Sequence, residues 1–510
     1  MVVLGPRPLT VDEVVAVARD REPVDVDPGV RDAMAPGRAV VDAAVAEGRT
    51  VYGVTTGFGA LATTRIDPAD AERVQHALVQ SHAAGMGPPV EAEVVRAMQL
   101  LRARTLAAGH SGVRPLLVEA IVALLNAGIT PAVPELGSLG ASGDLAPLAH
   151  AGVVLTGGGW VVDGHDTRQA LDEAGLAPVT LQAKEGLALL NGTEGMLAHL
   201  CLALRDLDVL LATVDVACAM SVEALRATDA AFAERVCGLR PHPGAVASAA
   251  NLRRLLAGSP IVASHRDSEH AVQDAYSIRC APQVHGAARD VIAWVRSTVE
   301  VELGSVTDNP VVFAPSADEP AGAVLSTGNF HGQPLAFAAD FACIALADLA
   351  AIVERRIDRL MDPVRSDGLP PFLAPEAGVN SGFMLAHYTG AAIVNRMRGL
   401  AAPQSIDSVP TSGGQEDHVS MGWNACRSLR LAVADAMRVV AIEAVCAAEA
   451  IELRGLPPAH ATGAVIEALR GRIPRMDADR FLAPDLAAAA GLVGAGALLD
   501  AVQREVGALA

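Results

Sequence analysis

The stretch GSLGASGDLAPLAH, residues 137–150, contains the residues with the most unusual chemical potential in the chain. It surrounds an Ala141-Ser142-Gly143 triplet with further glycines. If the Gly143 nitrogen is bent back against the Ala141 carbonyl carbon, the backbone can cyclise with loss of water. Loss of the Ser142 hydroxyl as a second water then leaves a methylidene group, an electrophile that no ordinary side chain supplies. The triplet therefore predicts either a structural turn or a backbone-derived electrophile.

Other chemistries that use glycine-rich turns or metal ions do not match the chain. The spacing G-x-x-G-x-x-G is neither the dinucleotide-binding G-x-G-x-x-G nor a P-loop, and Asp144 stands where a nucleophile elbow needs glycine. No HExxH and no other His/Cys/Asp spacing typical of a metal site occurs, so we expect no metal. Lys184 is the only lysine, so a pyridoxal-phosphate enzyme would have to use it, yet no phosphate-binding motif accompanies it.

Seven further motifs accompany the triplet, in this order: YGVTTGFG (52–59), SHAAGMG (81–87), KEGLALLNGTEG (184–195), VQDAYSIRCAPQVHG (272–286), TDNP (307–310), GNFHG (328–332) and QEDHVSMG (415–422). Together they resemble the aromatic amino-acid ammonia-lyase and aminomutase family, which depends on methylidene-imidazolone (MIO), over about residues 8–455. The resemblance implies a mainly helical, fumarase/aspartase-like bundle with a few short strands, built as a homotetramer with shared active sites. It also implies MIO formed from Ala141, Ser142 and Gly143, with no external cofactor.

The resemblance assigns roles to residues at matching positions. Tyr52 matches the base that removes the β-proton of the substrate. An ordinary phenol has a pKa of about 10, so such a base needs nearby cations, helix N-termini or hydrogen-bond donors. Arg279 matches the arginine that binds the substrate carboxylate, for which a planar guanidinium is suited. The positions around the electrophile and the amine are Asn191, Gln273 and Tyr276, and Phe330 matches an aromatic residue of the pocket.

Two residues indicate the substrate. His82 and Glu416 match positions that surround an imidazole in the histidine-specific members, and a carboxylate can accept a hydrogen bond from an imidazole N–H. The implied reaction is deamination of L-histidine to urocanate and ammonia. A tyrosine or phenylalanine ammonia-lyase, or a 2,3-aminomutase, including one of secondary metabolism, stays open. A helical oligomer without activity is the remaining alternative.

Several residues depart from the pattern of the histidine-specific members. The run before Glu416 reads SGGQED, His285 stands where an apolar residue is common, Gln333 replaces a frequent glutamate, and Gly304 replaces a common asparagine. None of these changes removes a group with an assigned role, but they can reshape the pocket.

The composition fits a helical enzyme with a large buried core. The chain has 510 residues, 51% of them apolar, and a formal charge of −19, which argues against a nucleic-acid or anionic-membrane surface. Seven cysteines without a CxxC pair indicate a reducing compartment. The N-terminus lacks the pattern of a signal peptide, and we find no apolar run typical of a membrane span. We therefore expect a cytoplasmic enzyme acting on a small amino acid.

Helices and strands must position these motifs, and the spacing of apolar residues predicts mainly helices. Thr10 and Glu13 have capping-box spacing before a helix. Long helices are expected at 90–126, 197–227, 334–362 and 418–454, a small hairpin near 153–165 and a strand that runs into a loop near 50–59. No linker divides the chain cleanly, and we distinguish an N-terminal region, 1–196, from a helical remainder, 197–510.

Overall fold

The computed structural model describes residues 1–57, 65–67, 70–162, 164–268, 270 and 272–510. The chain divides into two compact units, each assembled from separated segments. The first unit comprises 1–205, 296–340 and 403–427, and the second comprises 206–295, 341–402 and 428–510. These units are defined by contacts and not by order along the chain. The predicted division into residues 1–196 and 197–510 therefore stays a prediction.

The first unit holds most of the short elements. Its helices are α1 (Val11–Ala18), α2 (Val30–Ala46), α3 (Ala71–His82), α4 (Ala92–Ala107), α5 (Pro115–Asn126), α6 (Leu145–Leu155), α7 (Thr167–Glu173) and α8 (Glu185–Leu190), with the 3-10 turn η5 (Ser412–Gly414). Among the described residues of this unit, the strands form three separate pairs: parallel β1 (Val2–Leu4) with β2 (Val24–Val26), antiparallel β3 (Met86–Pro89) with β4 (Pro134–Leu136), and antiparallel β5 (Val311–Phe313) with β6 (Ala323–Leu325).

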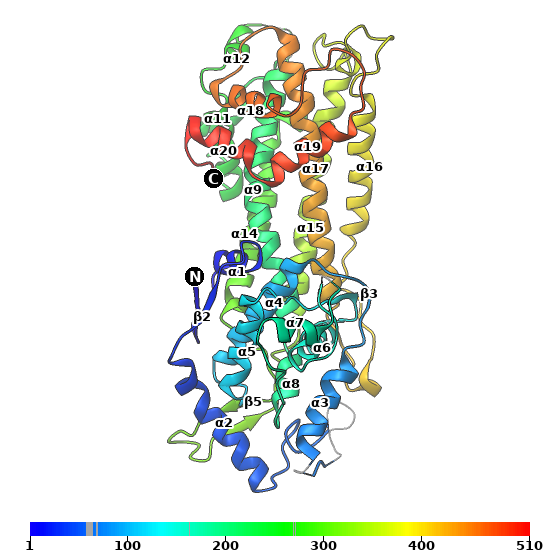
Figure 1. Cartoon of the computed structure of the whole chain (residues 1–510). Coiled ribbons are helices and arrows are strands. Elements are labelled where there is room, and N and C mark those ends of the chain that lie inside the picture. The colour runs from blue at the N-terminus through cyan, green and yellow to red at the C-terminus, as the bar shows by residue number, and fades with distance from the viewer. Residues whose placement is uncertain (58–64, 68–69, 163, 269, 271) are drawn as a thin grey trace. The chain divides into compact units, whose positions relative to one another are not determined.

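The regular elements among the described residues of the second unit are helices, joined by turns and loops. Its helices are α10 (Glu234–Cys237), α11 (Pro243–Leu255), α12 (Pro260–Ser264), α13 (Tyr276–Arg279), α16 (Met384–Leu400), α18 (His460–Arg470), α19 (Ala483–Gly494) and α20 (Ala497–Val506), with 3-10 turns η3 (Ala230–Phe232) and η4 (Pro371–Leu373). The longest helices contribute residues to both units: α9 (Glu194–Ala224), α14 (Ala281–Leu303), α15 (Gln333–Met361) and α17 (Gly422–Arg454). Figure 1 labels these four long helices and most of the other helices.

The mainly helical prediction is confirmed, and so is the first helix start. Thr10 Oγ1 accepts a hydrogen bond from Glu13 N, and the Glu13 carboxylate accepts one from Thr10 N, which is the predicted capping box. The long helices expected at 197–227, 334–362 and 418–454 correspond to α9, α15 and α17, the last beginning at Gly422.

Three local predictions were wrong. The helix expected over 90–126 is two helices, α4 and α5, because Gly109 and Gly112 between them adopt positive φ angles of 83° and 64° and Pro115 starts the second helix. The hairpin expected near 153–165 is instead the end of α6 followed by isolated bridges. In the strand expected at 50–59, the described residues 50–57 form turns with one bridge at Thr56, and 58–59 lie outside the described residues.

Helix α15 contains a long apolar stretch with few charged residues. By length and composition alone it could cross a membrane, and the bent pair α19–α20 passes the same test as one span. However, 56% of its most apolar 18-residue window is buried within the protein. That burial agrees with the sequence-based expectation of a core helix.

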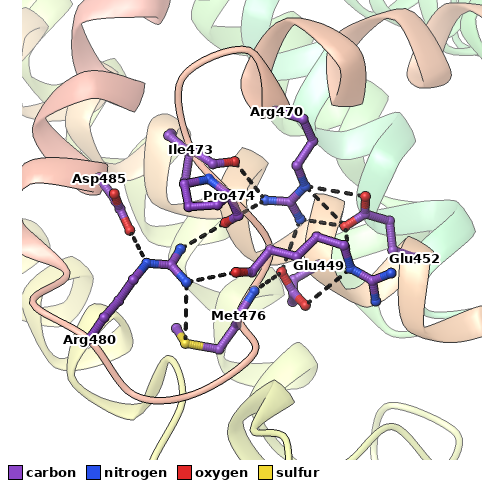
Figure 2. Close-up of polar contacts among 9 residues, drawn as sticks. Glu449, Glu452, Arg470, Ile473, Pro474, Met476, Arg480 and Asp485 are labelled. Atoms are coloured by element: carbon purple, nitrogen blue, oxygen red, sulfur yellow. Dashed lines mark hydrogen bonds and ion pairs between the residues drawn. The ribbon is translucent and has the colours of Figure 1, made fainter.

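Ion pairs and hydrogen bonds connect α17, α18 and α19 within the second unit (Figure 2). Arg470 of α18 pairs with Glu449 and Glu452, which lie on α17, with 2.9 Å between Arg470 Nη2 and Glu449 Oε2. Arg480 donates from Nε to Asp485 Oδ2 at the start of α19, at 2.8 Å. These bonds connect three successive helices through the loop between α18 and α19.

Candidate active site

A cavity of about 530 Å³ in the first unit collects residues from six separate segments. It is lined by Tyr52, Val74, Ala77, Leu78, Ser81, His82, Ser142, Leu145, Leu187, Leu190, Asn191, Asn309, Ser412 and Glu416. Five of the predicted site residues therefore lie together around one space: Tyr52, His82, Ser142, Asn191 and Glu416.

Helix α3 forms one wall of this cavity. Its lining residues Val74, Ala77, Leu78, Ser81 and His82 recur at helical spacing, so they share one face. At the end of that face, His82 Nδ1 lies 2.9 Å from the Leu78 carbonyl oxygen. Since a carbonyl can only accept, Nδ1 carries a proton, and in the neutral tautomer Nε2 is an acceptor.

Helix α8 packs against α3 and α6 and leads into Asn191. The buried Gln75 of α3 caps α8, because its Oε1 accepts hydrogen bonds from Gly186 N and Leu187 N at 2.9 and 3.3 Å. Just after α8, Asn191 donates from Nδ2 to the Asn309 carbonyl at 2.8 Å.

The turn at Ala141–Gly143 is held against the loop that follows Asn191. Ala141 and Gly143 form a bridge pair, Gly143 pairs with Gly192, and Asp144 N donates to Gly192 O at 2.7 Å. Gly143 has φ of 71°, and a Cβ there would lie 2.0 Å from Gly192 O. Only glycine fits this position, both sterically and conformationally.

A buried ion pair supports the Gly192 side of this contact. Arg102 Nη1 donates to the Asn191 carbonyl and to Glu194 Oε1, both at 2.9 Å, and the two side chains are almost completely buried. A Cβ on Gly192 would lie only 2.2 Å from Glu194 Oε2. The packing around Asn191 and Gly192 thus fixes the backbone that faces the triplet.

Glu416 reaches the triplet from the η5 loop. Its Oε1 accepts from Ser142 Oγ at 3.1 Å, and its Oε2 accepts from Thr411 Oγ1 at 3.0 Å. Thr411 and Glu416 also pair through their backbones, which closes the short loop between them. The carboxylate is therefore held in the cavity at the Ser142 side chain.

Tyr52 stands in a turn anchored by buried neighbours. Val54 belongs to the apolar cluster of Val40, Val41, Ala183 and Val312. Thr55 Oγ1 donates to the Arg49 carbonyl at 2.5 Å and accepts from Val51 N at 2.9 Å. These contacts fix the turn on both sides of Tyr52.

The remaining predicted site residues do not line this cavity. Phe330 is partly exposed in the turn before α15. Gln273, Tyr276 and Arg279 belong to the second unit, where Tyr276 is 72% exposed and the Arg279 guanidinium lies 4.5 Å from the Tyr276 ring centroid. Their predicted roles stay predictions.

Lys184 does not line the cavity either. It is fully buried, and its Nζ lies 2.6 Å from Asp308 Oδ2. Burial lowers the pKa of this ammonium, and Asp308 opposes that shift. Its place in a closed ion pair supports a structural role and does not support a Schiff-base role.

Sequence reasoning missed the apolar face of α3 and the contributions of Asn309 and Ser412 to the cavity. Asn309 lies in the quoted motif TDNP, which was the only available signal for it. The apolar spacing of α3 was readable, but periodicity alone does not distinguish a cavity wall from a packed core face.

Burial perturbs the acid next to the triplet. Desolvation raises the pKa of Asp144 to about 7, although Met196 N and Ser138 Oγ each donate to its carboxylate at 2.8 Å. Because its pKa is higher in the folded than in the unfolded state, Asp144 stabilises the fold at low pH, and this contribution is lost as pH rises through 7.

We expect Asp144→Asn to remove this pH dependence. Between about pH 5.5 and 8, the free energy of unfolding of the unsubstituted protein should fall by about 2 kcal/mol relative to the variant. Thermal unfolding of both proteins is measured across this pH range. Because other titrating groups contribute equally to both proteins, their effects cancel in the difference between the two free energies. Parallel curves would show that Asp144 keeps an ordinary pKa in the folded protein.

Comparison with known proteins agrees with this site. Residues 9–471 match the family described as aromatic amino acid lyase. The chain is 52% identical to histidine ammonia-lyase of Streptomyces avermitilis over 516 residues, covering 100% of this chain and 99% of the relative. It is 48% identical to histidine ammonia-lyase of Deinococcus radiodurans over 500 residues, covering 98% and 94%.

Solved structures show the same fold. Histidine ammonia-lyase from Trypanosoma cruzi aligns with a TM-score of 0.90 and 38% identity, covering 99% of this chain and 95% of that one. Tyrosine aminomutase from Streptomyces globisporus aligns with a TM-score of 0.93 and 36% identity, covering 100% of both chains. The chain therefore belongs to the aromatic amino acid lyase family and is a carbon–nitrogen lyase.

Proposed function

We propose that this protein is a histidine ammonia-lyase that converts L-histidine to urocanate and ammonia. The observation that carries the proposal is the cavity in which His82 and Glu416 accompany Tyr52, Ser142 and Asn191. His82 Nε2 and the Glu416 carboxylate are acceptors, and an imidazole ring carries an N–H that each can bind. A phenyl ring in the same place would leave the carboxylate without such a donor. The full-length relatives named histidine ammonia-lyase support the same substrate.

We propose that MIO forms from Ala141, Ser142 and Gly143. The residues present fit this group, since the bridge between Ala141 and Gly143 and the contact of Gly143 with Gly192 leave room only for a small, bent backbone. When formed, the group supplies an electrophilic carbon at the position of the Ser142 side chain. No external cofactor and no metal is part of the proposal.

The remaining chemistry falls to side chains of the chain itself. Tyr52 removes the β-proton of the bound amino acid as general base. The hydrogen bond from Asn191 Nδ2 to the Asn309 carbonyl holds the Asn191 amide in place. From this position the amide orients polar groups beside the triplet by hydrogen bonding. Glu416 binds the substrate imidazole and acts from the same position as a charged partner in catalysis.

We further propose that Gln273, Tyr276, Arg279 and Phe330 complete the site in a homotetramer with shared active sites. Arg279 would bind the substrate carboxylate through its planar guanidinium. The partner is a small amino acid in the cytoplasm, and neither nucleic acid nor a membrane is part of the proposal.

Incubation of the purified protein with L-histidine, L-tyrosine and L-phenylalanine separately tests the substrate. Ultraviolet spectra and product masses should show urocanate from histidine and no acrylate from the other two. An acrylate from tyrosine or phenylalanine would contradict the histidine assignment. A β-amino acid would identify an aminomutase, like the structural relative from Streptomyces globisporus.

We expect Glu416→Gln to lower kcat/KM for L-histidine about 10- to 100-fold, because a charge-assisted hydrogen bond becomes a weaker neutral one. Asp417→Asn removes the same charge at an exposed neighbour outside the cavity, and it should change kcat/KM less than twofold. Steady-state kinetics of both variants check this prediction. Equal losses in the two variants would show that charge near the loop, and not the position of Glu416, matters.

A further inference from the structure

A continuous set of buried polar groups connects four long helices within the second unit. Asp215 of α9, His285 of α14, Arg356 of α15 and Glu443 of α17 are each fully buried. His285 Nδ1 lies 2.8 Å from Asp215 Oδ1, and His285 Nε2 lies 3.3 Å from Arg356 Nη1. Arg356 forms a two-pronged ion pair with Glu443, with 2.9 Å between Nη2 and Oε2. His285 is therefore the link between two buried carboxylate sites.

The partners of His285 determine its protonation. Arg356 can only donate hydrogen bonds, so His285 Nε2 must accept, and Nδ1 must carry the proton that it donates to Asp215. Burial lowers the pKa of the His285 imidazole, Asp215 opposes this shift, and Arg356 adds to it. The ring is thus neutral, with one donor and one acceptor in fixed directions.

Both carboxylates keep other partners without His285. Asp215 accepts from Ser248 Oγ at 2.6 Å, from Asn251 Nδ2 at 2.9 Å and from Arg289 Nη2 at 2.8 Å. Glu443 accepts from Ser221 Oγ at 2.6 Å in addition to its pair with Arg356. Charge compensation therefore does not require the imidazole. What the imidazole supplies is an acceptor that orients Arg356 Nη1.

Arg356 Nη1 connects this network to α13. It donates to the Ser277 carbonyl at 3.3 Å, so its two N–H bonds serve His285 and Ser277. Ser277 lies in the single turn of α13, between Tyr276 and Arg279. A helix of one turn has few backbone hydrogen bonds of its own. The hydrogen bond from Arg356 to Ser277 therefore contributes strongly to fixing its backbone.

We propose that His285 is a positioning residue for α13: by orienting Arg356 Nη1 it fixes the Ser277 carbonyl, and with it the places of Tyr276 and Arg279. This inference depends on the proposed function, in which Arg279 binds the substrate carboxylate.

The proposal is tested with His285→Leu and His285→Gln in the full-length protein. Leucine removes both hydrogen-bonding groups, whereas the glutamine amide offers one donor and one acceptor. The control is His387→Leu, which removes a histidine–carboxylate bond to Glu354 (2.8 Å) elsewhere in the same unit. Melting temperatures of all variants measure the structural cost separately from binding.

The decisive readout compares ligands with and without a carboxylate. Inhibition constants are measured for imidazole-4-propionate, which has a carboxylate, and for histamine, which has none. His285→Leu should weaken imidazole-4-propionate about five- to tenfold and change histamine less than twofold. His285→Gln should restore most of the loss, and His387→Leu should lower the melting temperature without this selectivity.

Equal weakening of both ligands by His285→Leu, or no weakening of either, would overturn the proposal. Failure of the proposed function is distinguishable, since it would appear first as no turnover of L-histidine by the unsubstituted protein. In that case the comparison is repeated with the amino acid that is turned over and its decarboxylated amine. Every α-amino acid carries the carboxylate that Arg279 is proposed to bind, so the same selectivity is expected.

Discussion

Ser142→Ala is expected to lower kcat by about 10³-fold or more, because the side chain that would become the methylidene is lost. The substitution is small, and in the uncyclised chain it removes one hydrogen bond, that from Ser142 Oγ to Glu416 Oε1. The folded protein should therefore persist, with a melting temperature close to that of the unsubstituted enzyme. Turnover of L-histidine, followed by the absorbance of urocanate, measures the effect.

Ser138→Ala is the matched control for this substitution. Ser138 lies in the same loop and is buried, and its hydroxyl donates to Asp144 Oδ1 at 2.8 Å. Its loss should lower stability by about 1 kcal/mol but leave the triplet and most of the activity in place. If Ser142→Ala kept activity within tenfold of Ser138→Ala, the triplet would be a structural turn only.

Tyr52→Phe is expected to lower kcat about 10²- to 10⁴-fold, the usual contribution of a positioned general base. KM should change little, because the ring still fills the same part of the cavity wall. The measurement is steady-state kinetics combined with exchange of the β-proton in deuterated water, which reports on proton removal directly. Both turnover and exchange should fall together.

Tyr388→Phe provides the control for the loss of a phenolic hydroxyl. Tyr388 lies on α16 in the second unit, is 65% exposed and does not line the cavity. It should keep kcat within twofold of the unsubstituted enzyme. A Tyr52→Phe variant that exchanges the β-proton at the normal rate would contradict the assignment of the base.

Much of the helical architecture could be predicted from local sequence. The capping box at Thr10 and the apolar runs of α9 and α15 are signals carried by neighbouring residues, and the structure contains these helices. The break between α4 and α5 was missed because it depends on the conformation of Gly109 and Gly112. A Cβ on Gly112 would lie 2.5 Å from Val41 Cγ2, a contact visible only after folding.

The composition of the cavity was partly predictable. Tyr52, His82, Ser142, Asn191 and Glu416 were each identified from motifs, and the cavity gathers them from distant parts of the chain. The supporting pairs were not identified, since Lys184 and Asp308 are 124 residues apart and Arg102 and Glu194 are 92 apart. No periodicity or local pattern indicates such a partner, because it is selected by tertiary packing.

The central claim is that the Ala141-Ser142-Gly143 backbone becomes the electrophile, and a peptide mass tests it most directly. An active preparation is digested, and the peptide containing residues 141–143 is weighed by mass spectrometry. We predict that this peptide is lighter than its sequence by the mass of two water molecules, and that the same peptide from Ser142→Ala does not show that loss. A peptide of full sequence mass in enzyme that deaminates L-histidine would contradict the account.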